Sequence, residues 1–378
     1  MRTHSMSVRS RATIVAVAGL VASVSAVTGG GLTASAASNA GIQGSLSAFA
    51  VPGGVHIEQL SAGSDGKLWF VTPQSQLGSI SASGQATLTG AVLPHGSVPA
   101  VIAGAGLEGV WSYGNYDTAT FTRGACVLAL VTPDGTVHPV SLPSVAAQSV
   151  CGGAAVDTSG NLWASLSDQC GTFTCGQRVS FVVKVTHAGV VTLLPPPGPG
   201  KRSGPVTLAS DGSIWALGGY PSQVFGHYTA SGSTTGIEVP TGALTGLLAR
   251  PDGTFWGWKV IFCSGQNPPF CLRVSQVSAG GNSRVVFIFP VGISLSSADQ
   301  LAVDAGGALW EAGAERSGPS RFFRMNGDGT VDRSAAFPTA GASMLHDDGT
   351  LALTGAGTMW SSAETGSGAE YLVRFQPV

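Results

Sequence analysis

The sequence predicts an all-β protein, a seven-bladed β-propeller built from four-stranded antiparallel blades. A Gly-x-x-Trp pattern recurs along the chain and ends on Trp69, Trp163, Trp215, Trp256, Trp310 and Trp360, and Trp111 joins the series in the shortened form Glu108-Gly109-Val110-Trp111. The gaps between these tryptophans are 42, 52, 52, 41, 54 and 50 residues, close to the roughly 40 to 50 residues of one propeller blade. The 55 glycines and the 10% share of charged residues are typical of short strands joined by tight turns.

The first blade shows its four strands in order. We expect an inner strand at His56–Ala62 and further strands at Leu68–Thr72, Leu77–Ser81 and Ala86–Leu93, because apolar and polar residues alternate there. Asp-Gly and Ser-Gly pairs separate the first strand from the second and the third from the fourth in most blades. Such pairs supply the positive φ that tight hairpins require, so we assign them a structural role.

The last blade needs a strand from the other end of the chain. The fourth strands end on an apolar residue followed by a proline, at Pro94, Pro143, Pro195, Pro240, Pro290 and Pro338. A seventh such pair, Val51-Pro52, precedes the first blade, whereas the chain ends at Tyr371–Phe375 with the pattern of a third strand. We therefore expect Ser45–Val51 to complete the last blade and to close the ring.

The first 37 residues read as a secretory signal peptide. Arg2, Arg9 and Arg11 form a basic start, Ala12–Val27 is small and apolar, and Ala34-Ser35-Ala36 offers a cleavage site. The apolar run is short and weakly hydrophobic beside the roughly 20 residues that cross a bilayer, so we predict no membrane span. The expected product is secreted, is cleaved near Ala36 and forms one propeller domain over residues 38–378.

Charge and cysteine content narrow the choice of partners. Without its leader the chain has 15 basic residues against 20 acidic ones, which argues against nucleic acid. We expect a monomer whose partner is a small molecule, an extracellular protein or a glycan. Six cysteines in an exported chain favour disulfides, and their spacing favours the pairs Cys170–Cys175, Cys263–Cys271 and Cys126–Cys151. A zinc site is the alternative, although no Cys-x-x-Cys accompanies them.

The repeating tryptophans are expected to pack between neighbouring blades rather than to bind a ligand. Each stands at the same place in its repeat and follows an apolar residue. Trp258 differs, because it lies two residues beyond Trp256 on the same strand. That position is nearer the loop end of the strand, where we expect an exposed contact.

We call "loop face" the side of the ring that carries the loops after the second and fourth strands, and "turn face" the opposite side with the tight hairpins. Long loops at residues 113–125, 167–179 and 260–272 lie on the loop face, and all six cysteines lie in or beside them or the adjoining start of an inner strand. Such loops favour a rigid presented surface, and protection of the loops from proteolysis is the alternative. We expect Tyr113, Asn115 and Trp258 to contact a ligand there, since second strands end at that face.

A second group of residues is expected at the central opening of the same face. Strand direction places His56, Glu58 and Asp299 at the starts of inner strands, and Glu311 and Glu364 at the ends of second strands. The last two blades and the first are neighbours in a closed ring, which can bring these residues together. A histidine beside carboxylates can act as a general base or hold a divalent cation. A solvated histidine at the mouth of the opening is the alternative.

One segment points to a known family. Residues 63–72 read Gly-Ser-Asp-Gly-Lys-Leu-Trp-Phe-Val-Thr and are followed by Leu-Gly-Ser-Ile at residues 77–80, which resembles the repeat of the streptogramin lyase (virginiamycin B lyase) family. The turns, the spacing and the proline-terminated strands extend the resemblance over residues 45–378. Members of that family are seven-bladed propellers. Its enzymes open a cyclic depsipeptide at the ester bond by elimination, using a histidine base, glutamates and a magnesium ion.

The resemblance implies specific roles for the residues at the central opening. It implies His56 as the base, Glu364 as the supporting glutamate, and Asp299, Glu311 and Glu58 as candidate ligands of Mg²⁺. The family's repeat reads Trp-Phe-Thr-Glu with a histidine just beyond the glutamate, whereas here Glu364 is displaced by one residue and no histidine follows it. Three hypotheses therefore stand: a secreted propeller that binds a ligand through its stapled loop face, a lyase acting on a cyclic ester, and a purely structural scaffold.

Overall fold

The structure is a computed structural model of the chain. It describes residues 32–34, 41–63, 67–93, 100–102, 109–117, 123–147, 149–168, 180–196, 203–218, 223–229, 232–239, 244–262, 270–290, 301–314, 319–340, 343–347 and 350–378. Every regular element among these residues is a strand, apart from one 3₁₀ turn, η1 (Pro52–Gly54). No helix in these ranges is long and apolar enough to cross a membrane.

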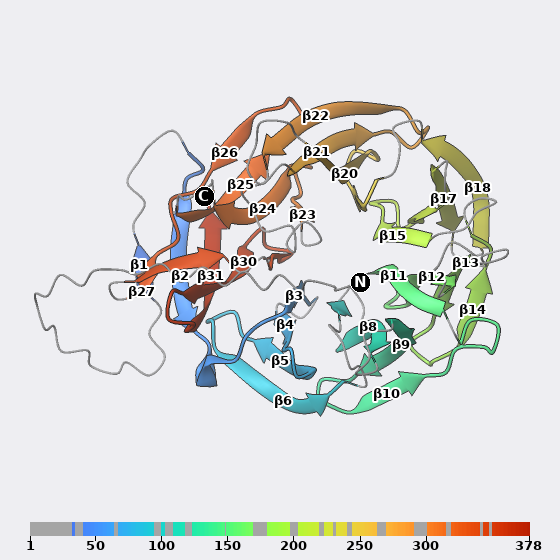
Figure 1. Cartoon of the computed structure of the whole chain (residues 1–378), viewed down its shortest axis with the longest axis horizontal. Helices are drawn as coiled ribbons and strands as arrows, with labels where there is room; N and C mark the ends of the chain where they lie inside the picture. The colour runs from blue at the N-terminus through green and yellow to red at the C-terminus, as the bar shows by residue number, and fades with distance from the viewer. Residues whose placement is uncertain are drawn as a thin grey trace, which may run out of the picture. The chain divides into compact units, whose positions relative to one another are not determined.

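The strands form seven antiparallel blades arranged in a ring (Figure 1), as the sequence predicts. Blade one holds β3 (Gln59–Ala62), β4 (Leu68–Val71), β5 (Gln76–Ile80) and β6 (Ala86–Val92). Blade two holds β7 (Ala100–Ile102), β8 (Val110–Asp117), β9 (Arg123–Val131) and β10 (Val137–Val140). Blade three holds β11 (Ser149–Val156), β12 (Leu162–Asp168), β13 (Ser180–Val185) and β14 (Val191–Leu194). Blade four holds β15 (Ser203–Leu208), β16 (Ile214–Gly218), β17 (Gln223–Thr229) and β18 (Gly232–Val239).

The remaining blades follow the same order of strands. Blade five holds β19 (Gly246–Ala249), β20 (Phe255–Phe262), β21 (Phe270–Val277) and β22 (Ser283–Pro290). Blade six holds β23 (Ala302–Val303), β24 (Leu309–Ala314), β25 (Ser320–Met325) and β26 (Val331–Arg333). Blade seven combines β28 (Ser343–Asp347) and β29 (Ala352–Leu353), both paired with β30 (Met359–Thr365), and then β31 (Glu370–Pro377) and β2 (Gly44–Ala50). A short β27 (Thr339–Ala340) pairs with β28.

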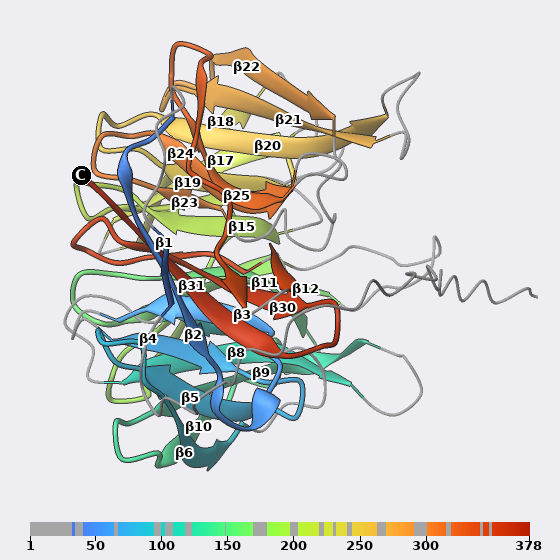
Figure 2. The same cartoon turned by 90° about the vertical axis from the view of Figure 1, so that its left-hand side faces the viewer.

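The N-terminal part of the chain closes the ring. Strand β2 pairs with β31 over seven residues, from Gly44 opposite Pro377 to Ala50 opposite Tyr371. Figure 2 shows β2 beside β31. The predicted completion of the last blade by an N-terminal strand is therefore confirmed. A further strand, β1 (Leu32–Ala34), pairs with the outer edge of β2, and with the short strands β27, β28 and β29 this sheet has seven strands where the other six have four.

The tight turns of the turn face share one backbone pattern. In the turn of blade three, the Asp157 N–H donates to the Asn161 carbonyl (2.9 Å) and the Gly160 N–H donates back to the Asp157 carbonyl (3.0 Å). Gly160 has a φ of 78°, a left-handed conformation that favours glycine, and the same two hydrogen bonds recur in most of the other turns. The structural role predicted for the Asp-Gly and Ser-Gly pairs follows from this geometry.

Each repeating tryptophan packs against the next blade. All seven are between 0% and 7% exposed. Trp69 lies with Val110 and Val131 of blade two, for example, and Trp360 lies with Leu68 of blade one across the closure. Trp111 and Trp256 also donate their indole N–H to a backbone carbonyl in the turn of the following blade, at 2.9 Å in both cases. The sequence-based prediction that the repeating tryptophans pack between neighbouring blades is therefore confirmed.

The inner strand of blade one is shorter than expected. It begins at Gln59 rather than at His56, because η1 and the residues after it carry the chain from the outside of blade seven to the inside of blade one. The backbone N–H of Glu58 still donates to the Val71 carbonyl (2.9 Å). His56 and Glu58 therefore lie in the connection on the loop face and precede the strand.

Candidate functional site

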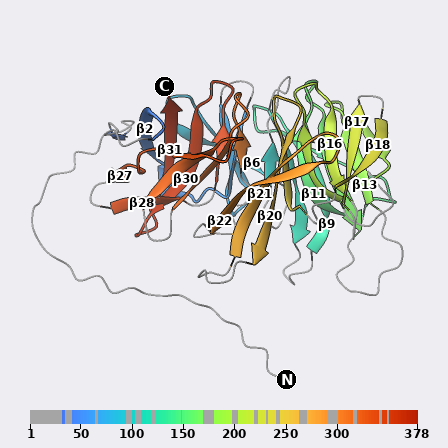
Figure 3. The same ribbon diagram turned by 90° about the horizontal axis from the view of Figure 1, so that it is seen from above.

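The loop face is where the blades differ. The second and third strands of blade one have four and five residues, whereas β8, β9, β20 and β21 have eight or nine. Figure 3 shows β9 and β20 reaching beyond most other strands on one side of the ring. The regular turn face therefore lies opposite a face with two long hairpins, one in blade two and one in blade five.

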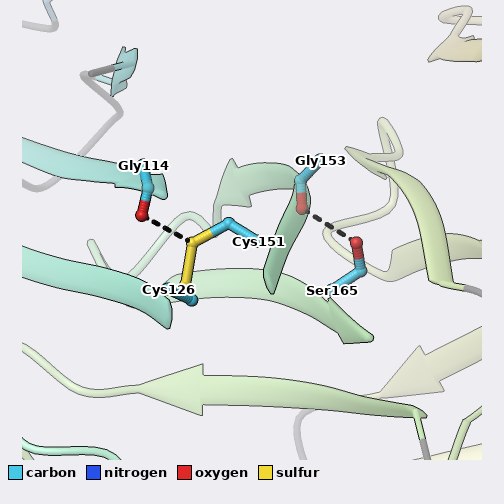
Figure 4. Close-up of a disulfide and its surroundings, with 5 residues drawn as sticks. All are labelled: Gly114, Cys126, Cys151, Gly153 and Ser165. Carbon is cyan, nitrogen blue, oxygen red and sulfur yellow. Dashed lines mark hydrogen bonds between the residues drawn. A yellow bond between two sulfur atoms is a disulfide. The ribbon is translucent and has the colours of Figure 1, made fainter. Parts of the chain in front are cut away.

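A disulfide joins two blades near the loop end of the blade-two hairpin. Cys126 in β9 is bonded to Cys151 in β11, the inner strand of blade three. The predicted Cys126–Cys151 pair is thus confirmed. The Cys151 sulfur also lies 3.3 Å from the Gly114 carbonyl oxygen of β8, so the bridge touches both strands of the hairpin (Figure 4). The predicted pairs Cys170–Cys175 and Cys263–Cys271 involve positions outside the described residues or side chains.

Two of the predicted ligand contacts flank this disulfide. Tyr113 is half-buried in β8 and packs against the core shared by blades two and three. Asn115 stands two residues further along β8, directly opposite Cys126 in the strand register. We call "stapled rim" the part of the loop face formed by Tyr113, Gly114, Asn115 and the Cys126–Cys151 bridge. Because the bridge crosses from one blade to the next, it limits hinge motion of the hairpin at this point.

The third predicted contact, Trp258, is not on the surface. Only 4% of it is exposed, and it packs with Leu272, Val274 and Leu301 in the core between blades five and six. The expectation of an exposed side chain is wrong here because Gly246, directly opposite in β19, leaves room for the ring: a Cβ on Gly246 would lie 1.9 Å from it. The indole N–H is buried and has no hydrogen-bond acceptor among the described residues.

His56 is paired with a carboxylate at the seam between blades seven and one. Its Nδ1 lies 2.7 Å from Oε1 of Glu370, the first residue of β31. The His56 side chain is 41% exposed, while that of Glu370 is 4% exposed. With Glu370 ionised, Nδ1–H donates to the carboxylate, and the lone pair of the neutral ring is then on Nε2. This arrangement orients an accessible imidazole against a buried acceptor.

Glu370 is a candidate functional residue that the sequence-based prediction does not include. Glu364, the glutamate chosen there, is exposed and lies directly opposite Glu370 in the pairing of β30 with β31. Opposite residues of an antiparallel pair project from the same side of the sheet, about 5 Å apart at Cβ. The short Thr365–Ala369 turn is the sequence feature that could have indicated Glu370, because this turn fixes the register that places Glu370 opposite Glu364. His346 of β28 is in turn opposite Glu364, which makes a backbone row of His346, Glu364 and Glu370.

The predicted magnesium ligands do not assemble from the described residues. Glu311 is 3% exposed in β24, opposite Phe323, and Glu58 is half-buried in the connection after His56. Asp299 lies outside the described residues. Within the described ranges, no group of three or more histidine, cysteine, aspartate or glutamate side chains could hold a metal ion. The donor set that Mg²⁺ prefers, several carboxylate and carbonyl oxygens around one point, is not formed by these residues.

The fold and its loop face define a class of protein: a seven-bladed propeller with a regular turn face and an elaborated, disulfide-stapled loop face. No protein-family model matches the sequence, and no curated protein matches it. Solved structures do match in fold. A streptogramin B lyase has a TM-score of 0.59 and 16% identity, over 90% of this chain and 100% of the lyase.

Two further structures with the same fold were solved with a bound molecule. A catalytically inactive virginiamycin B lyase from Staphylococcus aureus, with quinupristin, gives a TM-score of 0.58 and 16% identity over 89% of this chain and 100% of that one. YCF48 bound to D1 peptide gives 0.52 and 13% over 88% and 96%. At these identities the likeness shows the fold. The resemblance noted in the sequence is confirmed at that level.

Proposed function

We propose that this chain is an exported propeller that binds its ligand on the loop face, at the stapled rim between blades two and three. The observation that carries the proposal is the Cys126–Cys151 disulfide, which ties the long β8–β9 hairpin to the inner strand of the next blade. A surface that is fixed before binding loses less conformational entropy when a ligand arrives. The turn face has no comparable elaboration among the described residues.

The residue types in the stapled rim suit recognition of a polar molecule with apolar groups. Tyr113 combines a large ring with a hydroxyl, and tyrosine contributes contact area at a low cost in side-chain entropy. Asn115 adds an amide that can donate and accept hydrogen bonds. Propellers of the same fold have been solved with bound molecules, quinupristin in one case and the D1 peptide in another.

The binding proposal is tested by titrating the purified exported protein with quinupristin and by probing a glycan array with the same protein. The loop-face variant is Tyr113→Ala, and the matched control is Asp134→Asn, an exposed position on the turn face of the same blade. We expect saturable binding of at least one probe, lost in Tyr113→Ala and kept in the control. Absence of saturable binding, or equal loss in both variants, would rule the proposal out.

A second candidate, a lyase acting on a cyclic ester, is favoured by the pairing of His56 with Glu370 (2.7 Å). A histidine oriented by a buried carboxylate is a suitable general base near neutral pH. In this candidate, His56 Nε2 takes a proton from the carbon next to the one that carries the ester oxygen. The electron pair forms a C=C bond, the C–O bond breaks and a carboxylate leaves. Glu370 stabilises the imidazolium formed, and Glu364 lies within the same row.

In the enzymes of the streptogramin lyase family, a magnesium ion would stabilise the negative charge that develops on the substrate during elimination. The described residues of this chain do not form a site for it, so no step is assigned to the metal here. The base and its carboxylate partner are therefore the testable part of the second candidate.

The lyase candidate is tested with quinupristin as substrate, with and without added Mg²⁺. Elimination opens the ring without a change of mass, whereas hydrolysis adds one water, so mass spectrometry with chromatography separates the two. The decisive variant is His56→Gln, which keeps an N–H donor for Glu370 but removes the base. We expect loss of ring opening with an unchanged melting temperature. No ring opening by the unmodified protein, or full activity of His56→Gln, would eliminate this candidate.

A further inference from the structure

We propose that export removes the leader by a cut between Ala26 and Val27, directly after the segment Val24-Ser25-Ala26. The mature chain then begins at Val27 and keeps strand β1. This inference rests on the proposed export of the protein. It replaces the expected cleavage position near Ala36. The difference matters to the fold, because residues 27–36 contain the strand that covers the outer edge of the closing blade.

Strand β1 is part of the sheet. Its three residues pair antiparallel with β2, with Leu32 opposite Ala48, Thr33 opposite Ser47 and Ala34 opposite Leu46. Figure 1 shows β1 beside β2, on the side away from β31. Cleavage after Ala36 would remove this strand completely, whereas cleavage after Ala26 leaves it in the mature protein.

With β1 in place, the paired part of β2 is more buried than the described outer strands of blades one to three. The three β2 residues opposite β1, Leu46, Ser47 and Ala48, are all buried, with at most 3% exposed. In the outer strands β6, β10 and β14, by contrast, central residues such as Thr87, His138 and Thr192 are exposed. A flat, apolar and uncovered edge strand is a template for pairing with another chain. Strand β2 is also the one strand that holds the N-terminal end in the ring, so covering its edge protects the closure itself.

The sequence around Ala26 fits a cleavage site better than the sequence around Ala36. Signal peptides have an apolar core of about 7 to 15 residues followed by a short segment with small residues at the cleavage site. Here the run from Ala12 to Ala22 is such a core, and Val24-Ser25-Ala26 follows within four residues. The site at Ala36 is separated from the core by a stretch that includes three consecutive glycines, Gly29-Gly30-Gly31. Both the pattern of the leader and the pairing of β1 therefore point to the earlier site.

Two measurements on the full-length protein test the proposal. N-terminal sequencing and intact mass of the exported product identify its first residue. Hydrogen exchange then compares chains that start at Val27 and at Ala37, together with Thr33→Pro in the Val27 chain, which removes one N–H of β1 without shortening the protein. The internal control is β6, an outer strand with no such cover.

We expect the product to start at Val27. We also expect β2 amides to exchange about tenfold faster in the Ala37 chain or in Thr33→Pro, with β6 unchanged. A product starting at Ala37 would overturn the proposal while leaving export intact, and an uncleaved chain starting at Met1 would overturn both. Equal exchange of β2 in the Val27 chain and in Thr33→Pro would overturn the role of β1.

Discussion

The turn face and the loop face of this propeller are built by opposite rules. On the turn face, the same hydrogen-bonded turn recurs from blade to blade, and each tryptophan packs against the following blade. On the loop face, the connections range from the five-residue turn at Thr72–Gln76 to the long hairpins of blades two and five, and a disulfide and a histidine–carboxylate pair occur once each among the described residues.

This difference separates stability from function. A feature that repeats in every blade stabilises each junction of the ring, so its chemical variety is small. A feature that occurs in one place can change without loss of the ring, and function in repeat folds is found in such places. We therefore expect large stability effects for the closure and the turn face, and selective effects on ligands at the loop face.

The largest effect should come from opening the ring. A chain that starts at residue 51 lacks β2, so blade seven loses its outer strand and Leu46 and Ala48 leave the core between blades six and seven. We expect this chain to aggregate or to melt without cooperativity, because the edges of the ring are then unpaired. Circular dichroism and size-exclusion chromatography measure this, with the chain starting at Val27 as the control. A soluble, cooperatively melting truncate would contradict the closure.

The second largest effect on stability should come from the loop face, where the Cys126–Cys151 disulfide stabilises the folded protein. It closes a loop with a sequence separation of 25 residues. In the chain-entropy model such a bridge stabilises by about 3 kcal/mol. Urea unfolding of the double variant Cys126→Ser, Cys151→Ser should show a loss of that order, and binding to the stapled rim should weaken as well. Unchanged binding in the folded double variant would mean that the staple has no part in presenting the surface.

Strand β20 carries two buried tryptophans, Trp256 and Trp258, that differ in the hydrogen bonding of their indole N–H groups. Trp256 donates its indole N–H to the Gly307 carbonyl (2.9 Å), whereas the N–H of Trp258 has no acceptor among the described residues. Trp256→Phe should lower the free energy of unfolding by about 2 kcal/mol through the lost hydrogen bond and volume. Trp258→Phe should cost less, since it removes a buried donor that makes no hydrogen bond. Equal losses in urea unfolding would contradict this ranking.

The smallest predicted effect is a pH dependence from Asp157 in the turn of blade three. Burial acts to raise its pKa, but hydrogen bonds from Trp163 and Asn161 outweigh burial and hold the pKa below the ordinary 3.8. The ionised carboxylate is thus favoured in the folded state, and its contribution is complete above about pH 4 and is lost as the pH falls through the lowered value. Asp157→Asn should remove about 1 kcal/mol at pH 7 and flatten the acid limb. An acid limb as steep as that of the unmodified protein would disprove this.

The sequence predicts the ring more completely than the site. The tryptophan spacing, the turn pairs and the Val51-Pro52 signature report local geometry that repeats, and they predict the seven blades and the closure. Glu370 was missed because its partner, His56, is 314 residues away and meets it only across the closed seam. The burial of Trp258 depends on Gly246 in the neighbouring strand, which strand direction alone does not reveal. Long-range register, not local pattern, decides both.

In the proposed function, ligand recognition lies on the loop face and is separable from the stability of the ring. The most direct measurement is a paired titration and thermal melt of the unmodified protein, Tyr113→Ala and Asp134→Asn with the probe that binds, quinupristin or an array glycan. We expect Tyr113→Ala to lose binding and Asp134→Asn to keep it, while both variants still melt cooperatively. Binding that survives in Tyr113→Ala and is lost in Asp134→Asn would contradict it.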